Sequence, residues 1–290
     1  VTRLRAAGYA PPPVIPPDPP LPARPRRLLV EQLSHRYADS HAALQDVSLG
    51  VGQGEFVALV GHNGSGKTTL AKHIMGLLRP TRGRVLLDDR PIHTFAPAEL
   101  AQRIGYVFQD PDHQLFAATT WDEVAFGPRN VGLGVVEVDE RVRAALAAVE
   151  LDHLGGEDPF LLDKGSRQRL AVASVLSLRP DVLLLDEPTT GLDAREQRRM
   201  LDLLRRLHAG GQTILIITHT PWVIAEYTER VIMLRGGALA YDGPVRPFFA
   251  DAALVRVASF EPPQITQLGR HFGCTPLRVD ELLTWWQGPA

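Results

Sequence analysis

Residues 56–68 read FVALVGHNGSGKT, and the order of residue types in this stretch decides the fold. The first five residues are an apolar run of the kind that forms a buried strand. The next eight, Gly61-His62-Asn63-Gly64-Ser65-Gly66-Lys67-Thr68, fit the pattern G-x-x-x-x-G-K-[ST] of a phosphate-binding loop. The helical pattern LAKHIMGLL follows directly. Strand, loop and helix thus stand in the order that the motif requires, and a chance match in a glycine-rich turn is the weaker alternative.

The residue types of this loop predict its chemistry. Glycines let backbone N–H groups converge on phosphate oxygens, and the N-terminus of the following helix adds a positive dipole end. Lys67 is long enough to reach the β- and γ-phosphates of a nucleotide, and the Thr68 hydroxyl is a ligand for Mg²⁺. The sequence therefore predicts that the phosphates of a nucleotide and Mg²⁺ bind here, through Gly61, His62, Asn63, Gly64, Ser65, Gly66, Lys67, Thr68 and Thr69.

Two acidic residues at the end of another apolar run predict the second half of the site. The run VLLLD occupies residues 182–186, and Glu187 follows it. Asp186 would hold Mg²⁺ through its water shell, and Glu187 would polarise the attacking water. The alternative is an acid pair that caps a helix, but one acid would suffice for a cap, and Pro188 already starts the next turn.

Other short runs predict the rest of the sheet. Three are strongly apolar (IGYVFQ at 104–109, TILIIT at 213–218 and RVIML at 230–234), and LLVEQLSHRY at 28–37 alternates well enough for a strand. Runs this short and apolar fit strands buried on both faces, as in parallel sheets. Between them, residues 137–154 and 195–208 carry apolar residues at helical spacing. Strands that alternate with helices predict an α/β fold.

Composition excludes several classes of protein. The 290 residues include 31 Lys and Arg against 33 Asp and Glu, and the net charge of -2 excludes strong electrostatic capture of nucleic acid by the protein as a whole, with a local basic patch as the open alternative. The apolar runs fall far short of the roughly 18 residues of a membrane-spanning helix. Cys274 is the single cysteine, so a disulfide scaffold is excluded. The first residues also lack the apolar segment of a secretory signal peptide.

Both ends of the chain differ in composition from its middle. Nine of the 24 prolines fall within residues 11–25, so residues 1–27 are predicted to be a Pro-rich linker, with an SH3-type ligand as the alternative. Residues 244–290 are predicted to be a C-terminal helical extension, with helices at 264–272 and 279–286. Trp285 and Trp286 in it either cover core surface at the chain end or mark a partner contact.

The spaced motifs between residues 28 and 243 resemble the nucleotide-binding domain of an ABC transporter. The resemblance implies a P-loop NTPase core with a mainly parallel sheet, an antiparallel β subdomain and an inserted helical subdomain at about residues 112–178. It implies that Tyr37 stacks on adenine and that Gln109 touches Mg²⁺ and senses the membrane partner. It further implies that Asp193, in the D-loop TGLD, reaches a second subunit, and that His219 lies near the γ-phosphate.

Two segments resemble one branch of that family. QDPDHQLF at 109–116 and DEVAFGP at 122–128 are similar to the ATPase subunits of energy-coupling factor transporters. The resemblance implies an ATPase pair beneath a membrane scaffold protein, with a separate small membrane protein that captures a vitamin, a vitamin precursor, or a cobalt or nickel ion.

One motif departs from the family pattern. Where the signature LSGGQ is expected, the chain reads Leu162-Asp163-Lys164-Gly165-Ser166. In the family this motif binds the γ-phosphate held by the opposite subunit, so a carboxylate at Asp163 is electrostatically unfavourable there, and Lys164 would compensate in part. We therefore expect a complete phosphate-binding loop beside a degenerate signature.

Taken together, the resemblance implies an ATP-hydrolysing subunit or domain that powers an importer and is peripheral at the cytoplasmic face of the membrane. The implied partners are integral membrane transporter subunits and a second, non-identical ABC ATPase domain with an intact signature, but not nucleic acid. The Pro-rich leader predicts fusion to an upstream ATPase domain.

Two other functions are alternatives to transport. An ABC-type ATPase acting on nucleic acid or the ribosome usually carries a coiled-coil insertion or a highly charged arm, and the sequence has neither. A regulatory, non-hydrolysing subunit would not need Lys67, Asp186, Glu187 and His219 together. The identity of the transported substrate is not encoded in this chain.

Overall fold

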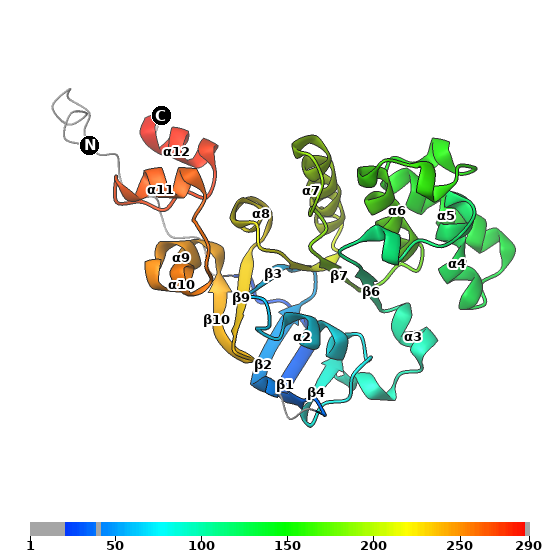
Figure 1. Cartoon of the computed structure of the whole chain (residues 1–290), viewed down its shortest axis with the longest axis horizontal. Coiled ribbons are helices and arrows are strands. Elements are labelled where there is room, and N and C mark those ends of the chain that lie inside the picture. The colour runs from blue at the N-terminus through cyan, green and yellow to red at the C-terminus, as the bar shows by residue number, and fades with distance from the viewer. Residues whose placement is uncertain (1–20, 39–41, 288–290) are drawn as a thin grey trace.

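The computed structural model describes residues 21–38 and 42–287, which form two sheets with helices around them (Figure 1). The fold is α/β, with one mainly parallel and one antiparallel sheet, so the predicted fold class is confirmed. Within these described residues no helix combines the length and the apolar character needed to cross a membrane. The side chains of Trp285 and Trp286, for which two roles were open, lie outside the described residues, as do residues 1–20 of the leader.

The larger sheet has six strands in the order β10-β9-β3-β8-β7-β6. Strands β9, β3, β8, β7 and β6 are parallel, and β10 pairs antiparallel with β9 at one edge. The five short apolar runs predicted as strands are all confirmed, although two of them end one or two residues earlier than predicted. The strands are β3 (Phe56–Val60), β6 (Ile104–Val107), β7 (Val182–Asp186), β8 (Thr213–Ile217), β9 (Arg230–Arg235) and β10 (Ala238–Pro244).

The smaller sheet is antiparallel and has the order β2-β1-β4-β5. Its strands are β1 (Arg26–Arg36), β2 (Ala42–Gly52), β4 (Arg82–Leu87) and β5 (Arg90–Pro91). Of these, the sequence pattern predicted only β1. In β1 the register shifts between Val30 and Leu33, where Gln32 has a left-handed φ of 47°. The shift places Leu33 and His35 on the buried face that Leu28 and Val30 begin.

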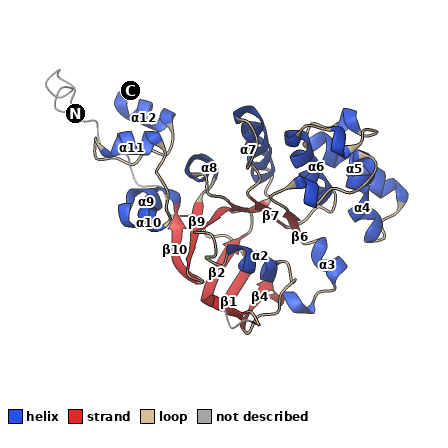
Figure 2. Ribbon diagram, in the orientation of Figure 1, coloured by secondary structure: helices blue, strands red, loops and turns tan. Residues whose placement is uncertain are grey.

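Helix α2 (Lys67–Ile74) lies between the two sheets, as Figure 2 shows. Alternate residues of each parallel strand enter different hydrophobic cores because side chains along a strand point to opposite faces. Val57 and Leu59 of β3 pack with the antiparallel sheet and α2, whereas Phe56 and Ala58 pack with the helices on the other face. This layering holds the start of α2 against the carboxyl end of β3, where the phosphate-binding loop connects them.

The outer helices form two groups at opposite ends of the molecule (Figure 1). One group contains α4 (Thr120–Asn130), α5 (Val135–Ala148) and α6 (Lys164–Leu176), which contact one another. Helix α5 corresponds to the helix predicted at 137–154 but ends earlier than expected. The chain turns at Glu150, whose φ is 64°. The remaining helices of the sheet region are α3 (Pro97–Ala101), α7 (Ala194–Ala209) and α8 (Pro221–Tyr227), with short 3-10 turns at Ile92–Thr94, Pro111–His113, Asp152–Leu154 and Pro159–Leu161.

The C-terminal helices are α9 (Val245–Ala250), α10 (Ala252–Val257), α11 (Gln264–Arg270) and α12 (Val279–Gln287). Of these helices, α9 packs on β9 and β10 at the edge of the larger sheet, α10 packs on α9, and α11 contacts α12. Phe248, Phe249 and Phe260 join the main hydrophobic core, and Arg246 of α9 is 3.0 Å from Glu281 of α12. At the other end of the chain, Arg24 donates to Glu229 at 2.8 Å, so residues just before β1 already contact the domain.

Candidate nucleotide site

The phosphate-binding loop joins β3 to α2 and depends on glycine at two positions. Gly61 has φ 144° and Gly66 has φ 105°, conformations that other residues rarely adopt. A Cβ on Gly61 would lie 2.3 Å from the Leu234 carbonyl oxygen, and one on Gly66 would lie 2.6 Å from the Ala43 carbonyl oxygen. The loop therefore runs against neighbouring backbone, and side chains at these two positions would push it away.

The N-terminus of α2 is open to an anion. Its first residue follows Gly66, and no side chain caps the free N–H groups of the first turn. Lys67 is buried, and its ammonium donates to the carbonyl oxygens of Gly61 at 2.6 Å and His62 at 3.0 Å. Burial lowers the pKa of Lys67, while the charges of Glu187 and Asp186 oppose that shift. A cation and free N–H donors thus meet at one point, which suits a phosphate group.

A cavity of about 660 Å³ lies over this loop, within the range of small-molecule sites. It brings together most of the predicted site residues from five separate stretches of chain. They are Tyr37, Asn63, Gly64, Gly66, Lys67, Thr68, Thr69, Gln109, Asp186, Glu187 and His219. Sequence reasoning missed four further lining residues, namely Ala43, Thr190, Ile217 and Thr220.

Glu187 and His219 face each other across the carboxyl ends of β7 and β8. The Nε2 atom of His219 lies 3.3 Å from Glu187 Oε1, and the Glu187 side chain is buried. Burial raises the pKa of Glu187 to about 7, with a contribution from the nearby charge of Asp186. Burial also lowers the pKa of His219, as does the charge of Lys67. A carboxylate with a pKa near neutrality is suited to take a proton from water.

Asp186 has a partner that the sequence did not reveal. The Tyr106 hydroxyl, on β6, donates to Asp186 Oδ2 at 2.9 Å, and burial raises the pKa of Tyr106, which keeps it a neutral donor. Thr68, Gln109 and Asp186 line the same cavity and supply a hydroxyl, an amide and a carboxylate oxygen. Oxygen ligands of these kinds fit Mg²⁺. The only sequence signal for Tyr106 was its place on the neighbouring apolar strand.

Tyr37 stands at the rim of the cavity, just after β1, and its side chain is 37% exposed. Its hydroxyl lies 3.2 Å from the Thr69 hydroxyl on α2. An exposed aromatic ring beside a phosphate-binding helix offers a flat surface for stacking.

His62 points away from the cavity although it belongs to the predicted loop. Its Nε2 atom lies 2.6 Å from the carbonyl oxygen of Val257 at the end of α10. This contact joins residues 195 positions apart and ties the phosphate-binding loop to the C-terminal helices.

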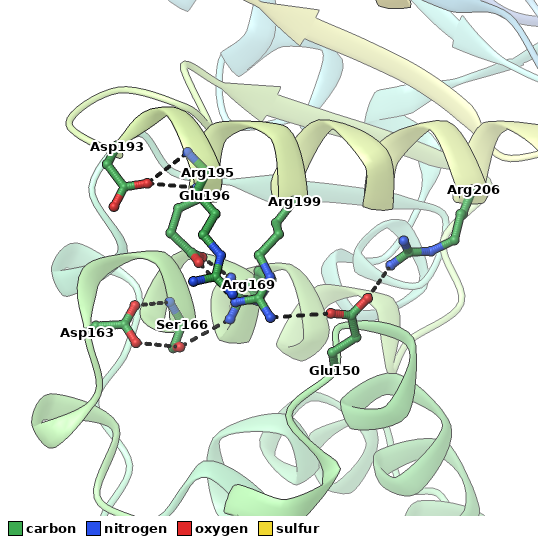
Figure 3. A network of polar contacts seen from close by, with 9 residues as sticks. All are labelled: Glu150, Asp163, Ser166, Arg169, Asp193, Arg195, Glu196, Arg199 and Arg206. Atoms are coloured by element: carbon green, nitrogen blue, oxygen red, sulfur yellow. Dashed lines mark hydrogen bonds and ion pairs between the residues drawn. The ribbon is translucent and has the colours of Figure 1, made fainter.

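The signature residues lie apart from the cavity lining and form their own hydrogen-bond network, shown in Figure 3. Asp163 is the N-cap of α6: its Oδ1 atom accepts from the Ser166 N–H at 2.9 Å, and its Oδ2 atom accepts from the Ser166 hydroxyl at 2.9 Å. The sequence-based expectation concerned only the unfavourable charge of Asp163 toward a partner's phosphate and did not include this cap. Lys164 lies over the D-loop, where a Cβ on Gly191 would be 2.4 Å from its Nζ atom.

The same network joins the signature to the D-loop helix α7. Buried Arg169 donates to the Ser166 hydroxyl at 3.2 Å and also donates to Glu196 in the first turn of α7. A Cβ on Gly165 would meet the Glu196 carboxylate, so the two helix starts are closely packed. Asp193 caps α7 by accepting from the N–H groups of Arg195 and Glu196 at 2.9 Å. In Figure 3, Asp193 and Asp163 lie on the same side of this network, to the left of the arginine residues.

A phosphate-binding loop on a parallel sheet, with an acid pair at the end of a neighbouring strand, defines a P-loop ATPase. The profile of the ABC transporter family matches residues 44–190. An ABC transporter ATP-binding protein of Caldanaerobacter subterraneus is 47% identical over 254 residues, which cover 88% of this chain and 45% of that protein. The chain thus spans less than half the length of this relative.

Two further relatives match over most of their own length. The energy-coupling factor transporter ATP-binding protein EcfA of Methanocaldococcus jannaschii is 38% identical, and the match covers 82% of this chain and 86% of that protein. The structure of CbiO1 from Clostridium perfringens, part of the ABC transporter complex CbiONQ, has a TM-score of 0.75 and 35% identity, covering 85% of this chain and 100% of that one. The chain belongs to the ABC transporter ATPase family, whose members hydrolyse ATP to power transport.

Proposed function

We propose that this chain hydrolyses ATP for an energy-coupling factor importer of a vitamin, a vitamin precursor or a transition-metal ion. The observation that carries the proposal is the similarity to EcfA and to CbiO1, which extends along nearly the full length of both proteins. Residues 109–116 and 122–128, which resemble that branch, support it. The substrate would be chosen by a separate membrane protein, as the resemblance to energy-coupling factor transporters implies.

The roles of the site residues form part of the same proposal. Lys67 and the free N–H groups of α2 would bind the β- and γ-phosphates, and Tyr37 would stack on the adenine. Thr68, Gln109 and Asp186 would hold Mg²⁺, which neutralises charge on the phosphate oxygens when it is bound. Glu187 would accept the proton of the attacking water, and His219, 3.3 Å away, would orient that carboxylate.

The assembly we propose is a pair of unlike ATPase domains. ABC cassettes form dimers in solved structures. Asp163, Lys164, Gly165, Ser166 and Asp193 would serve the partner's nucleotide in trans. A partner with a serine at the position of Asp163 would complete this chain's own site. The pair would bind membrane subunits at the cytoplasmic face, as a peripheral complex without nucleic acid.

Co-purification tests the proposal against its rivals. A tagged chain expressed with its natural neighbouring genes should purify with an integral membrane scaffold protein and a second ATPase domain, and cargo uptake into vesicles should require ATP. Recovery with ribosomes or nucleic acid instead would favour the nucleic-acid rival. A transport-competent complex that is unaffected by Glu187→Gln would favour a regulatory, non-hydrolysing subunit.

A further inference from the structure

A row of three aromatic rings runs from the rim of the nucleotide cavity into the core of the smaller sheet. The ring of Tyr37 lies 4.6 Å from the ring of His35, and His35 lies 4.7 Å from His73. Both contacts are T-shaped, with interplanar angles of 83° and 69°. Such edge-to-face contacts are favourable because the positive edge of one ring meets the negative face of the next.

His35 is unusual because it occupies a core position without a conventional hydrogen bond. Its side chain is buried on the face of β1 that otherwise carries Leu28, Val30 and Leu33. Neither ring nitrogen has a hydrogen-bond partner among the described residues. A buried polar ring without partners costs free energy, and a leucine would fill this slot without that cost. In place of hydrogen bonds, the imidazole of His35 makes aromatic contacts on its two sides.

The row connects β1 to the helix that binds phosphate. His35 and Tyr37 are two residues apart at the end of β1, and Thr69 and His73 are four apart on one face of α2. The Tyr37 hydroxyl lies 3.2 Å from that of Thr69, and the His35 ring makes its T-shaped contact with His73. His73 is itself fixed, because its Nδ1 atom lies 3.0 Å from the Leu78 carbonyl oxygen. Tyr37 is therefore held to α2 at two points.

We propose that His35 is a positioning residue that holds the Tyr37 ring at a fixed height above the phosphate-binding helix. The inference rests on the proposed stacking of Tyr37 on adenine. Lys67 and Thr68 stand at the start of α2, and Thr69 and His73 lie further along the same helix. One rigid helix would thus set both the phosphate site and, through His73 and His35, the surface for the base.

The test compares ATP with tripolyphosphate, which has the phosphates but no base. Binding of each, with Mg²⁺, is measured by calorimetry on the full chain. His35→Leu should weaken ATP binding by about 3- to 10-fold, the range expected for one lost aromatic pair, and leave tripolyphosphate binding within twofold. His35→Phe, which keeps the ring edge, should restore ATP binding. His93→Leu, at an exposed histidine that does not line the cavity, is the control and should change the binding of neither ligand.

Tyr37→Ala separates failure of the inference from failure of the proposed stacking. If Tyr37→Ala leaves ATP binding unchanged, the stacking role is wrong and the inference falls with it. If Tyr37→Ala weakens ATP selectively but His35→Leu does not, only the inference is overturned. Equal losses of ATP and tripolyphosphate in His35→Leu would also overturn it, because they would mean general damage to α2. Should His35→Leu fail to fold, His73→Leu removes the other end of the row and must show the same selective loss of ATP.

Discussion

Helices α2 and α6 begin at the phosphate-binding loop and at the signature motif, and they differ in whether a side chain caps the N-terminus. Helix α2 follows Gly66, and no side chain caps its first N–H groups. Helix α6 follows Asp163, whose carboxylate accepts from the N–H and the hydroxyl of Ser166. An uncapped helix start keeps its donors for a bound anion, whereas a capped one supplies the anion from its own chain. The first suits a nucleotide held by this subunit; the second is already satisfied within the fold.

The largest expected effect is on the side of α2. Glu187→Gln should lower the kcat of ATP hydrolysis in the assembled complex by ~10²–10⁴-fold, because it removes the proposed general base. ATP should still bind, and a stable ATP-bound state should accumulate, as measured by retention of radiolabelled nucleotide. The control is Glu226→Gln, an exposed glutamate on α8. Normal turnover by Glu187→Gln would show that another group activates water.

Lys67→Ala tests the anion site itself. Loss of a charged donor to the phosphates should weaken ATP binding by roughly 10- to 100-fold, in line with a hydrogen bond between charged groups. Lys72→Ala provides a matched control, since Lys72 is an exposed lysine on the same helix. Equal weakening by both substitutions, measured by calorimetry, would mean that net charge rather than the contact of Lys67 matters.

The raised pKa of Glu187 predicts that the free energy of unfolding depends on pH, because the charged carboxylate is costly to bury. The folded-state pKa of about 7 lies above the ordinary value of 4.5, so the folded protein holds the proton more tightly than the unfolded chain. Stability linked to the protonated form is present below pH 4.5 and is lost as the pH rises through 7. Between pH 5.5 and pH 8 the natural chain should therefore lose on the order of 2 kcal/mol of unfolding free energy that the Glu187→Gln variant does not lose. Urea denaturation at the two pH values measures it, and a constant difference between the proteins would contradict the assignment.

On the side of α6, restoring the family signature should have a smaller effect. The triple change Asp163→Ser, Lys164→Gly and Ser166→Gln should raise ATP turnover of the isolated chain about tenfold, if hydrogen-bond donors at that helix start serve a second copy. Turnover is compared with that of the unaltered chain across protein concentrations. A fast unaltered chain that the repair does not improve would remove the basis for two unequal sites.

The smallest effect separates the cap from the charge at Asp163. Asp163→Ala should lower the unfolding free energy by about 1 kcal/mol, because the first turn of α6 loses its acceptor, while Asp163→Ser should lower it by a few tenths at most. Asp251→Ala, at the N-cap of α10, offers a comparison at a helix start outside the network of Figure 3. Equal stability of the alanine and serine variants would show that the hydrogen bonds of Asp163 contribute nothing.

The sequence predicted those parts of the molecule that local pattern determines. The strands β3 and β7 have the predicted limits because runs such as FVALV are apolar at every position, which only a doubly covered strand allows. Strand β2 is covered mainly on one face, and β4 is exposed over its first three residues and buried over its last three, so their mixed composition gave no comparable signal. The meeting of Lys67, Asp186 and Glu187 in one cavity followed from the rule that parallel strands end at one edge of a sheet.

Other contacts could not be predicted because they depend on tertiary structure. No local pattern indicates that Tyr106 donates to Asp186, or that His62 contacts Val257, 195 residues away. The cap at Asp163 is a different case, because an aspartate three residues before Ser166 at a helix start is a readable local signal. The family resemblance instead assigns Asp163 to a contact with the partner subunit, so the cap within its own helix was not predicted.

The backbone of Glu187 carries one further consequence. Its φ of 46° lies in the left-handed region, which glycine adopts without strain but glutamate does not. A glycine at this position would relax the main chain and also remove the cost of a buried carboxylate, yet it would abolish the proposed base. The proposed catalytic role and resistance to heat therefore favour different residues at this position. Directed evolution that screened this protein for thermal survival alone would be drawn to replace Glu187, at the expense of the chemistry that the fold supports.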